Sequence, residues 1–122
     1  MILLTVFGKL VHDPEMKYSE NGTEYLSLNL YTSEWDFKTK KRFTGKVRVT
    51  VFGKQAESLN NNIKKGCGVL ASGDLEISPV SGGCPTYNKT DGSTVSSISI
   101  RGSTVTILTW PEKGEEVNVD GD

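Results

Sequence analysis

The feature of this sequence that most limits its fold is a strict alternation of apolar and polar residues in two short segments. In LSLNL, residues 26–30, leucine occupies every second position, and in KVRVTVF, residues 46–52, valine does the same. Successive side chains of a strand point to opposite faces, so this period of two predicts two strands, each with one buried face. The residues of the second face are left exposed, and they become the first candidates for function.

Other segments predict more strands. Residues 2–7 are apolar and rich in β-forming residues, and alternation returns over residues 69–77, 95–100 and 104–108. Asp91-Gly92 and Gly102 are typical of turns. Three longer segments, residues 13–25, 33–46 and 78–93, are expected to form long hairpin tips or loops.

Between residues 55 and 65 the period lengthens to that of a helix. Apolar residues recur there at i, i+3 and i+7, two lysines follow where the helix dipole favours cations, and a glycine supplies a stop. The residues concerned are Ala56, Leu59 and Ile63, then Lys64, Lys65 and Gly66. The sequence therefore predicts one short helix.

This order of elements predicts an all-β protein, a five- to six-stranded OB-fold barrel with one short helix between strands 3 and 4. In such barrels the face of strands 2 and 3 and the neighbouring loops bind oligomers. A different small barrel fits the alternation almost as well, and the position of the helix favours the OB-fold.

Length and charge point to one domain with an acidic end. The chain has 122 residues, with 14 Lys and Arg and 15 Asp and Glu. Only one of the cations but five of the acids lie in residues 111–122, so the remainder carries a net positive charge. We expect a domain over residues 1–110, suited to a polyanionic partner, and a short disordered acidic tail over residues 111–122.

The sequence argues against several other classes. No apolar run is long enough to span a membrane, and the first residues do not resemble a secretion signal, so a cytoplasmic protein is expected. The cysteines Cys67 and Cys84, with His12 as the one histidine, form neither a disulfide framework nor a zinc site. We also find no nucleophile–histidine spacing, no glycine-rich phosphate loop and no metal cluster, so we expect no enzyme activity and no metal.

The exposed face of the valine strand has the chemistry of a single-strand binding surface. Lys46, Arg48, Thr50 and Phe52 would stand in one row, ~6.6–6.8 Å apart. Cations can follow phosphates, and an aromatic ring can stack on any base. On the leucine strand, Asn29 and Tyr31 would share that face.

The hairpin after the leucine strand interleaves rings and cations: Trp35, Phe37, Lys38, Lys40, Lys41, Arg42 and Phe43. The alternative is an ordinary amphipathic strand, with Phe52 covering a barrel end and the cations merely solvated. An exposed Trp or Phe beside cations is costly unless a ligand or another subunit covers it, so the residues taken together favour binding.

Several motifs resemble the bacterial-type single-stranded DNA-binding proteins (SSB). VFGKQAESLNNNIKKG, residues 51–66, is similar to the family's strand end, helix and Lys-Gly stop, and FGKLVHDPEMKYSENGTEYLSLNLYTSE, residues 7–34, is similar to its first half. GDLEIS and the TDG turn continue the resemblance, which covers residues 2–108 in colinear order.

The resemblance implies an OB-fold that assembles as a homotetramer or dimer, binds single-stranded DNA without sequence choice and uses no cofactor. It matches Arg48, Phe52 and Lys54 to the family's DNA face and Lys17, Lys64 and Lys65 to its basic positions. Trp35 lies within one residue of the family's hairpin tryptophan, and Tyr87 stands where members often have Trp.

Two departures from the family pattern stand out. Lys46 occupies a position that is usually aromatic, so a cation replaces one stacking platform. The sequence ends at Asp122 without the family's flexible linker and its acidic, partner-recruiting Pro-Phe tip. A phage, plasmid or organelle origin, or a trimmed chain, stays open.

Together these features predict a protein that binds and protects single-stranded DNA during replication, recombination or repair, in the cytoplasm with the nucleoid. The expected DNA-binding residues are Lys17, Tyr31, Trp35, Lys41, Arg42, Lys46, Arg48, Thr50, Phe52, Lys54, Tyr87 and Lys89. One alternative is an accessory OB module that docks a protein partner through the same face, and another is a binder of double-stranded DNA or RNA.

Overall fold

A computed structural model describes residues 1–110 of the chain. It contains eight strands and one helix in these residues: β1 (Leu3–Leu10), β2 (Glu15–Tyr18), β3 (Glu24–Asp36), β4 (Lys41–Phe52), α1 (Gly53–Asn62), β5 (Gly68–Leu75), β6 (Thr86–Asn88), β7 (Thr94–Ser96) and β8 (Ser99–Thr109). The expected acidic tail, residues 111–122, lies outside the described residues.

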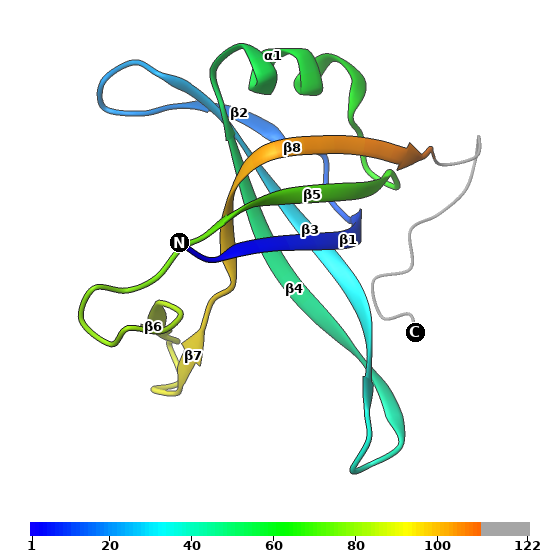
Figure 1. Cartoon of the computed structure of the whole chain (residues 1–122), viewed down its shortest axis with the longest axis vertical. Helices are drawn as coiled ribbons and strands as arrows, with labels where there is room; N and C mark the ends of the chain where they lie inside the picture. The colour runs from blue at the N-terminus through cyan, green and yellow to red at the C-terminus, as the bar shows by residue number, and fades with distance from the viewer. Residues whose placement is uncertain (111–122) are drawn as a thin grey trace.

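The main sheet closes into a barrel. Its strand order is β1-β5-β8-β4-β3-β2, and β1 also pairs with β3 at Lys9↔Tyr31 and Leu10↔Leu30. Five strands therefore form the barrel, and the short β2 adds to the outer edge of β3. Counted on the barrel strands alone, the helix lies between the third and the fourth, which confirms the predicted all-β OB-fold (Figure 1).

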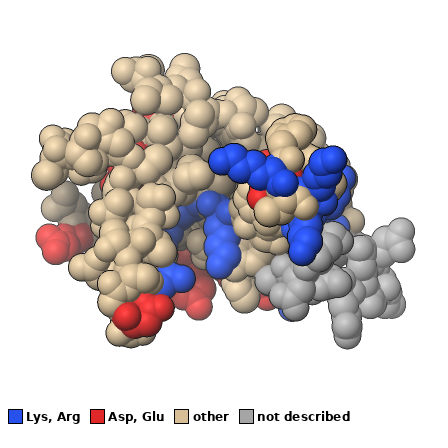
Figure 2. Space-filling view, turned by 90° about the horizontal axis from the view of Figure 1, so that it is seen from below, with Lys and Arg blue, Asp and Glu red and all other residues tan. Residues whose placement is uncertain are grey.

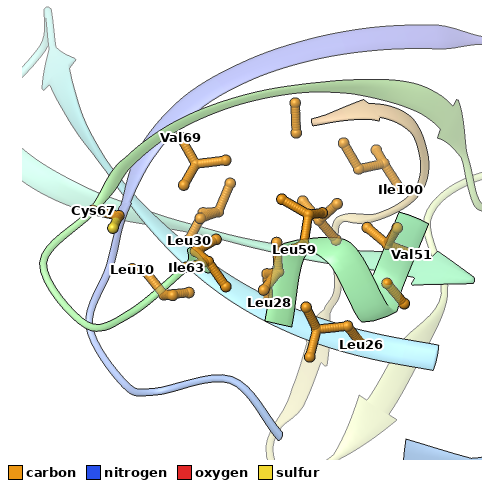
Figure 3. Close-up of a cluster of buried hydrophobic side chains, with 13 residues drawn as sticks. Leu10, Leu26, Leu28, Leu30, Val51, Leu59, Ile63, Cys67, Val69 and Ile100 are labelled. Carbon is orange, nitrogen blue, oxygen red and sulfur yellow. The ribbon is translucent and has the colours of Figure 1, made fainter. Parts of the chain in front are cut away.

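The core consists of the alternating apolar positions. Leu26, Leu28 and Leu30 of β3 and Val49 and Val51 of β4 are completely buried. The buried residues of α1 cover one end of the barrel and join the same cluster (Figure 3). The predicted inward faces of both strands are thus confirmed.

The helix begins and ends earlier than residues 55–65. Gly53, with φ of +68°, turns the chain directly from β4 into α1, and Ile63 is already extended, with φ −85° and ψ 142°. Beyond it the chain is bound to the end of β1, because Gly66 donates its N–H to the Leu10 carbonyl at 2.8 Å. The expected helical positions of Lys64 and Lys65 were therefore wrong.

Gly102 is not a turn. It lies inside β8, opposite Gly73 of β5, where the pairing shifts register. A Cβ at Gly102 would lie 3.1 Å from a methyl carbon of Val49 and 3.3 Å from one of Val51. The glycine is required by the close approach of β8 to the core, so the predicted break between two strands falls instead between β7 and β8.

The predicted long loops contain more strand than expected. Residues 13–25 hold β2, and β3 and β4 continue to Asp36 and Lys41, leaving a turn of four residues with Lys40 at φ +57°. Figure 1 shows this long hairpin and the separate β6–β7 pair projecting from the same end of the barrel.

Candidate nucleic-acid interface

The outer face of β4 carries the predicted row. Val49 and Val51 are buried and Val47 is half-buried, so the alternate residues Lys46, Arg48, Thr50 and Phe52 point outward. Three of these are exposed and Thr50 is half-buried. Phe52 leaves 42% of its surface exposed although it is an aromatic residue next to the core.

Strand β3 contributes a second row beside the first. The register pairs Tyr25 with Phe52, Ser27 with Thr50, Asn29 with Arg48 and Tyr31 with Lys46. Partners in neighbouring strands project from the same side of a sheet. The predicted neighbours of β4 therefore lie where they were expected, and the two rows form one continuous surface, here called the strand face.

Two contacts order the side chains of the strand face. The Lys46 ammonium lies 5.7 Å from the centroid of the Tyr31 ring, a cation–π distance. At the other end, the rings of Tyr25 and Phe52 have centroids 5.9 Å apart and are inclined by 41°. Each end of the strand face thus has an exposed or half-exposed ring, and Arg48 lies between them.

Lys17 joins the strand face through β2. It is the cross-strand partner of Tyr25, which in turn pairs with Phe52. Lys17 is exposed, so its ammonium is available beside this aromatic pair. Lys54 is also exposed and follows Gly53 at the start of α1.

The β3–β4 hairpin continues the strand face away from the barrel. Trp35 is 45% exposed and pairs with Arg42, whose guanidinium carbon lies 5.9 Å from the indole ring centroid. Arg42 also donates to Ser33 Oγ at 3.1 Å, which holds the cation over the ring. Lys41 pairs with Asp36, and its side chain therefore points to the opposite face of the hairpin from that of Arg42.

The hairpin turn is tied by Asp36. Its carboxylate accepts hydrogen bonds from the Thr39 hydroxyl at 2.8 Å and from the Lys38 N–H at 3.0 Å. The Thr39 bond, followed by the Lys38 bond, lowers the pKa of Asp36 below its ordinary value of 3.8. The turn that presents the basic tip is therefore held by an ionised carboxylate.

Tyr87 and Lys89 lie on the other projection. Tyr87, in β6, is 55% exposed, and Lys89 is exposed in the turn to β7. The two residues are not part of the strand face. They belong to the β6–β7 pair, which projects from the same end of the barrel (Figure 1).

Sequence reasoning missed residues brought to the strand face by other strands. Lys9 of β1 pairs with Tyr31, and Arg101 of β8 pairs with Thr50. Both are exposed cations. The buried Ile100 is a signal that Arg101 points outward, but its place beside Thr50 depends on the parallel β4–β8 pairing, which the local sequence does not encode.

The surface charge is uneven. Figure 2 views the molecule from below relative to Figure 1 and shows Lys and Arg gathered on the side of the β3–β4 hairpin and in a hollow beside it. The visible Asp and Glu lie mostly toward the other side. Such a distribution attracts a polyanion to one part of the surface.

The described residues contain neither a metal-binding cluster nor a membrane-spanning helix. No group of three or more His, Cys, Asp or Glu side chains in residues 1–110 is arranged to hold a metal ion. In the same part of the chain, no helix is long and apolar enough to cross a membrane.

A closed OB-fold barrel with exposed rings and cations along two adjacent strands defines a nucleic-acid binding protein of the OB class. Comparison with known families agrees, because the model of the single-strand binding protein family matches residues 1–108. The chain belongs to this family, as the resemblance predicted. Members are DNA-binding proteins without enzymatic activity, consistent with the expectation that this chain is not an enzyme.

A solved structure shares the fold. It is the small single-stranded DNA-binding protein from Streptomyces coelicolor, with a TM-score of 0.63 and 17% sequence identity. The similarity covers 88% of this chain and 94% of that one. At this identity the likeness concerns the fold, and it supports the OB-barrel assignment.

Proposed function

We propose that the protein binds and protects single-stranded DNA, without sequence specificity, during replication, recombination or repair. The observation that carries this proposal is the strand face, where Lys46, Arg48 and Phe52 stand exposed in one row beside Tyr31 and Tyr25. Cations and rings on one continuous surface can hold the phosphates and the bases of an extended strand together. Membership of the single-strand binding protein family supports the same function.

The proposed mechanism is passive sequestration. Bases stack on exposed rings, and because every base has a π-face the sequence matters little. The stacking rings are Trp35, Phe52, Tyr31 and Tyr87. Cations follow the backbone, and these are Lys17, Lys41, Arg42, Lys46, Arg48, Lys54 and Lys89, while Thr50 donates a hydrogen bond from the centre of the row.

DNA would run from the hairpin along β4 to α1. Trp35 and Arg42 lie at the hairpin end of this path, and Phe52 lies where β4 meets α1. The β6–β7 pair would add contacts from the other side through Tyr87. This path keeps the strand beside cations throughout its length.

We propose further that the protein acts as a homo-oligomer, a tetramer or a dimer, through the N-terminal strand. One edge of β1 pairs with β5 from Leu3 to Lys9, whereas the other pairs with β3 only at Lys9 and Leu10. Within the described residues, the rest of that edge has no strand partner and could pair with a second copy. Light scattering on a gel-filtration column, with and without oligo(dT), measures the assembly, and a monomer in both runs would contradict it.

The last twelve residues, 111–122, have a separate proposed role. With five acids against one lysine, they would form a tail that competes with DNA for the basic domain of residues 1–110. Deleting them should raise affinity for oligo(dT) at low salt, and unchanged affinity would refute the competition. The proposed location of the protein is the cytoplasm, in association with the nucleoid.

Tryptophan fluorescence tests the proposed function. A Trp110→Phe variant leaves Trp35 as the sole tryptophan. Oligo(dT) should quench its emission stoichiometrically, and a duplex of equal length should compete poorly. An absence of quenching at low salt would favour the accessory module that binds a protein partner, and equal competition by duplex would favour double-stranded DNA or RNA binding.

A further inference from the structure

A hollow of about 400 Å³ opens beside Phe52, between β4, β8 and the end of β5. This volume lies in the range of small-ligand sites. The lining mixes apolar side chains with an aromatic ring and several polar groups, of which the charged ones are Asp74, Glu76 and Arg101. The strand face thus ends in a concave site that contains acidic side chains, whereas the charged side chains of the strand face itself are cations.

The strand register connects this hollow to the strand face. Thr50 of β4 pairs with Arg101 of β8, and Arg101 pairs with Asp74 of β5. Cross-strand partners project from the same side of a sheet. Asp74 is therefore part of the same surface as Thr50, two strands away from it.

Asp74 has an unmet hydrogen-bonding capacity. Its side chain is half-buried, and Oδ1 is buried without a hydrogen-bond partner among the described residues. Leaving a buried acceptor unpaired is unfavourable, and a ligand that donates an N–H to the carboxylate removes that cost. The Cβ–Cγ torsion of Asp is broad, so the carboxylate can rotate to present both oxygens to a ligand in the hollow.

The charge of the hollow selects which part of DNA can occupy it. Asp74 and Glu76 are both acidic, and they repel phosphate. Arg101 lines the hollow beside Thr50, and Arg48 is the neighbouring outward residue on β4. Both attract phosphate. With two acids against one cation in its lining, the hollow favours an uncharged base over a phosphate.

Resting on the function proposed above, we infer that this hollow is a base subsite that prefers guanine at one position of the bound strand, while the stacking and phosphate contacts elsewhere remain insensitive to sequence. The Watson–Crick edge of guanine has two adjacent donors, N1–H and the N2 amino group, which match the two oxygens of a carboxylate. Cytosine and adenine place an acceptor beside their single donor group, and thymine places acceptors on both sides of N3–H. Phe52, at the rim, supplies a ring against which the base packs.

Two oligonucleotides that differ by one amino group test this subsite. Oligo(dT) carrying a single deoxyguanosine is compared with the same oligonucleotide carrying deoxyinosine, which lacks the N2 amino group. We expect the unaltered protein to bind the guanine oligonucleotide about tenfold more tightly. The Asp74→Asn variant should lose that ratio.

The ratio is the decisive readout, because removing any carboxylate strengthens binding of every anionic oligonucleotide. Glu57→Gln, on the exposed side of α1, removes the same charge away from the hollow and should leave the ratio unchanged.

Equal affinities for both oligonucleotides, with oligo(dT) still bound, would overturn the subsite alone. A ratio that persists in Asp74→Asn would also overturn it, whereas no binding of any oligonucleotide would overturn the proposed function as well. The comparison in the unaltered chain holds even if the variant fails to fold.

Discussion

The rings of Tyr25 and Phe52 lie across the β3–β4 pairing with their centroids 5.9 Å apart. Phe52 is the last residue of β4, and Tyr25 lies beside it near the start of β3. This pair holds the Phe52 ring at an inclined angle while leaving 42% of the residue exposed. The orientation of the exposed part is therefore set by the fold, as the proposed stacking of a base on Phe52 requires.

Replacing the Phe52 ring gives the first prediction. Phe52→Ala should weaken binding of oligo(dT) by about 1–3 kcal/mol, because base stacking on an aromatic ring contributes that much. Phe52→Tyr keeps the ring and should bind nearly as tightly as the unaltered chain. Fluorescence titration at fixed salt measures both. Equal loss in the two variants would show that Phe52 acts through the fold and not through stacking.

Lys46 gives the second prediction. Its ammonium lies 5.7 Å from the centroid of the Tyr31 ring. If its ammonium neutralises a phosphate, the Lys46→Trp variant should show a log–log salt slope shallower by about 0.7, with stacking compensating part of the affinity.

The matched control for this titration is Lys46→Arg, which keeps the charge and should keep the slope. A flat salt dependence in the unaltered protein would contradict phosphate tracking by the strand face altogether. A slope unchanged in Lys46→Trp would remove Lys46 from the set of phosphate contacts and leave the other cations in place.

Glycine at position 73 is the subject of the third prediction. A Cβ there would overlap the backbone carbonyl of Arg101, and backbone cannot move aside as a flexible side chain can. Gly73→Ala should therefore lower the free energy of unfolding by at least about 2 kcal/mol. Gly83→Ala, where the nearest atom would be Ser81 Oγ at 3.9 Å, should change it little. Urea unfolding at one protein concentration compares them, and equal stability of the two variants would contradict the close β5–β8 contact.

Much of the strand face was predictable because a period of two is local information. The valines of β4 decide which side chains turn outward, so Lys46, Arg48 and Phe52 follow from the alternation alone. The register of β3 with β4 follows from a hairpin whose two strands are adjacent in sequence. These are the parts of the site that need no knowledge of distant contacts.

The hollow beside Phe52 was not predictable in the same way. It depends on the parallel pairing of β4 with β8 and on the approach of β5, which join residues far apart in sequence. Gly102 misled the prediction for the same reason. A glycine between polar residues is typical of a turn, yet here it is required by the side chains of Val49 and Val51 in the core.

The fourth prediction concerns pH and the hairpin tip. Hydrogen bonds from Thr39 and then from Lys38 lower the pKa of Asp36 below 3.8. Because the pKa of Asp36 is lower in the folded turn than in the unfolded chain, its carboxylate stabilises the turn at every pH above the unfolded-state pKa. That contribution is lost as the pH falls through the lower pKa of the folded state. Between about pH 5 and 8 this group should therefore leave the tip and its DNA affinity unchanged.

The carboxyl carbon chemical shift of Asp36 should titrate below 3.8, and the Lys38 amide signal should be lost at the same midpoint. The Asp36→Asn variant should show no such transition. A midpoint at or above the ordinary value would mean that these two hydrogen bonds do not hold the turn in solution.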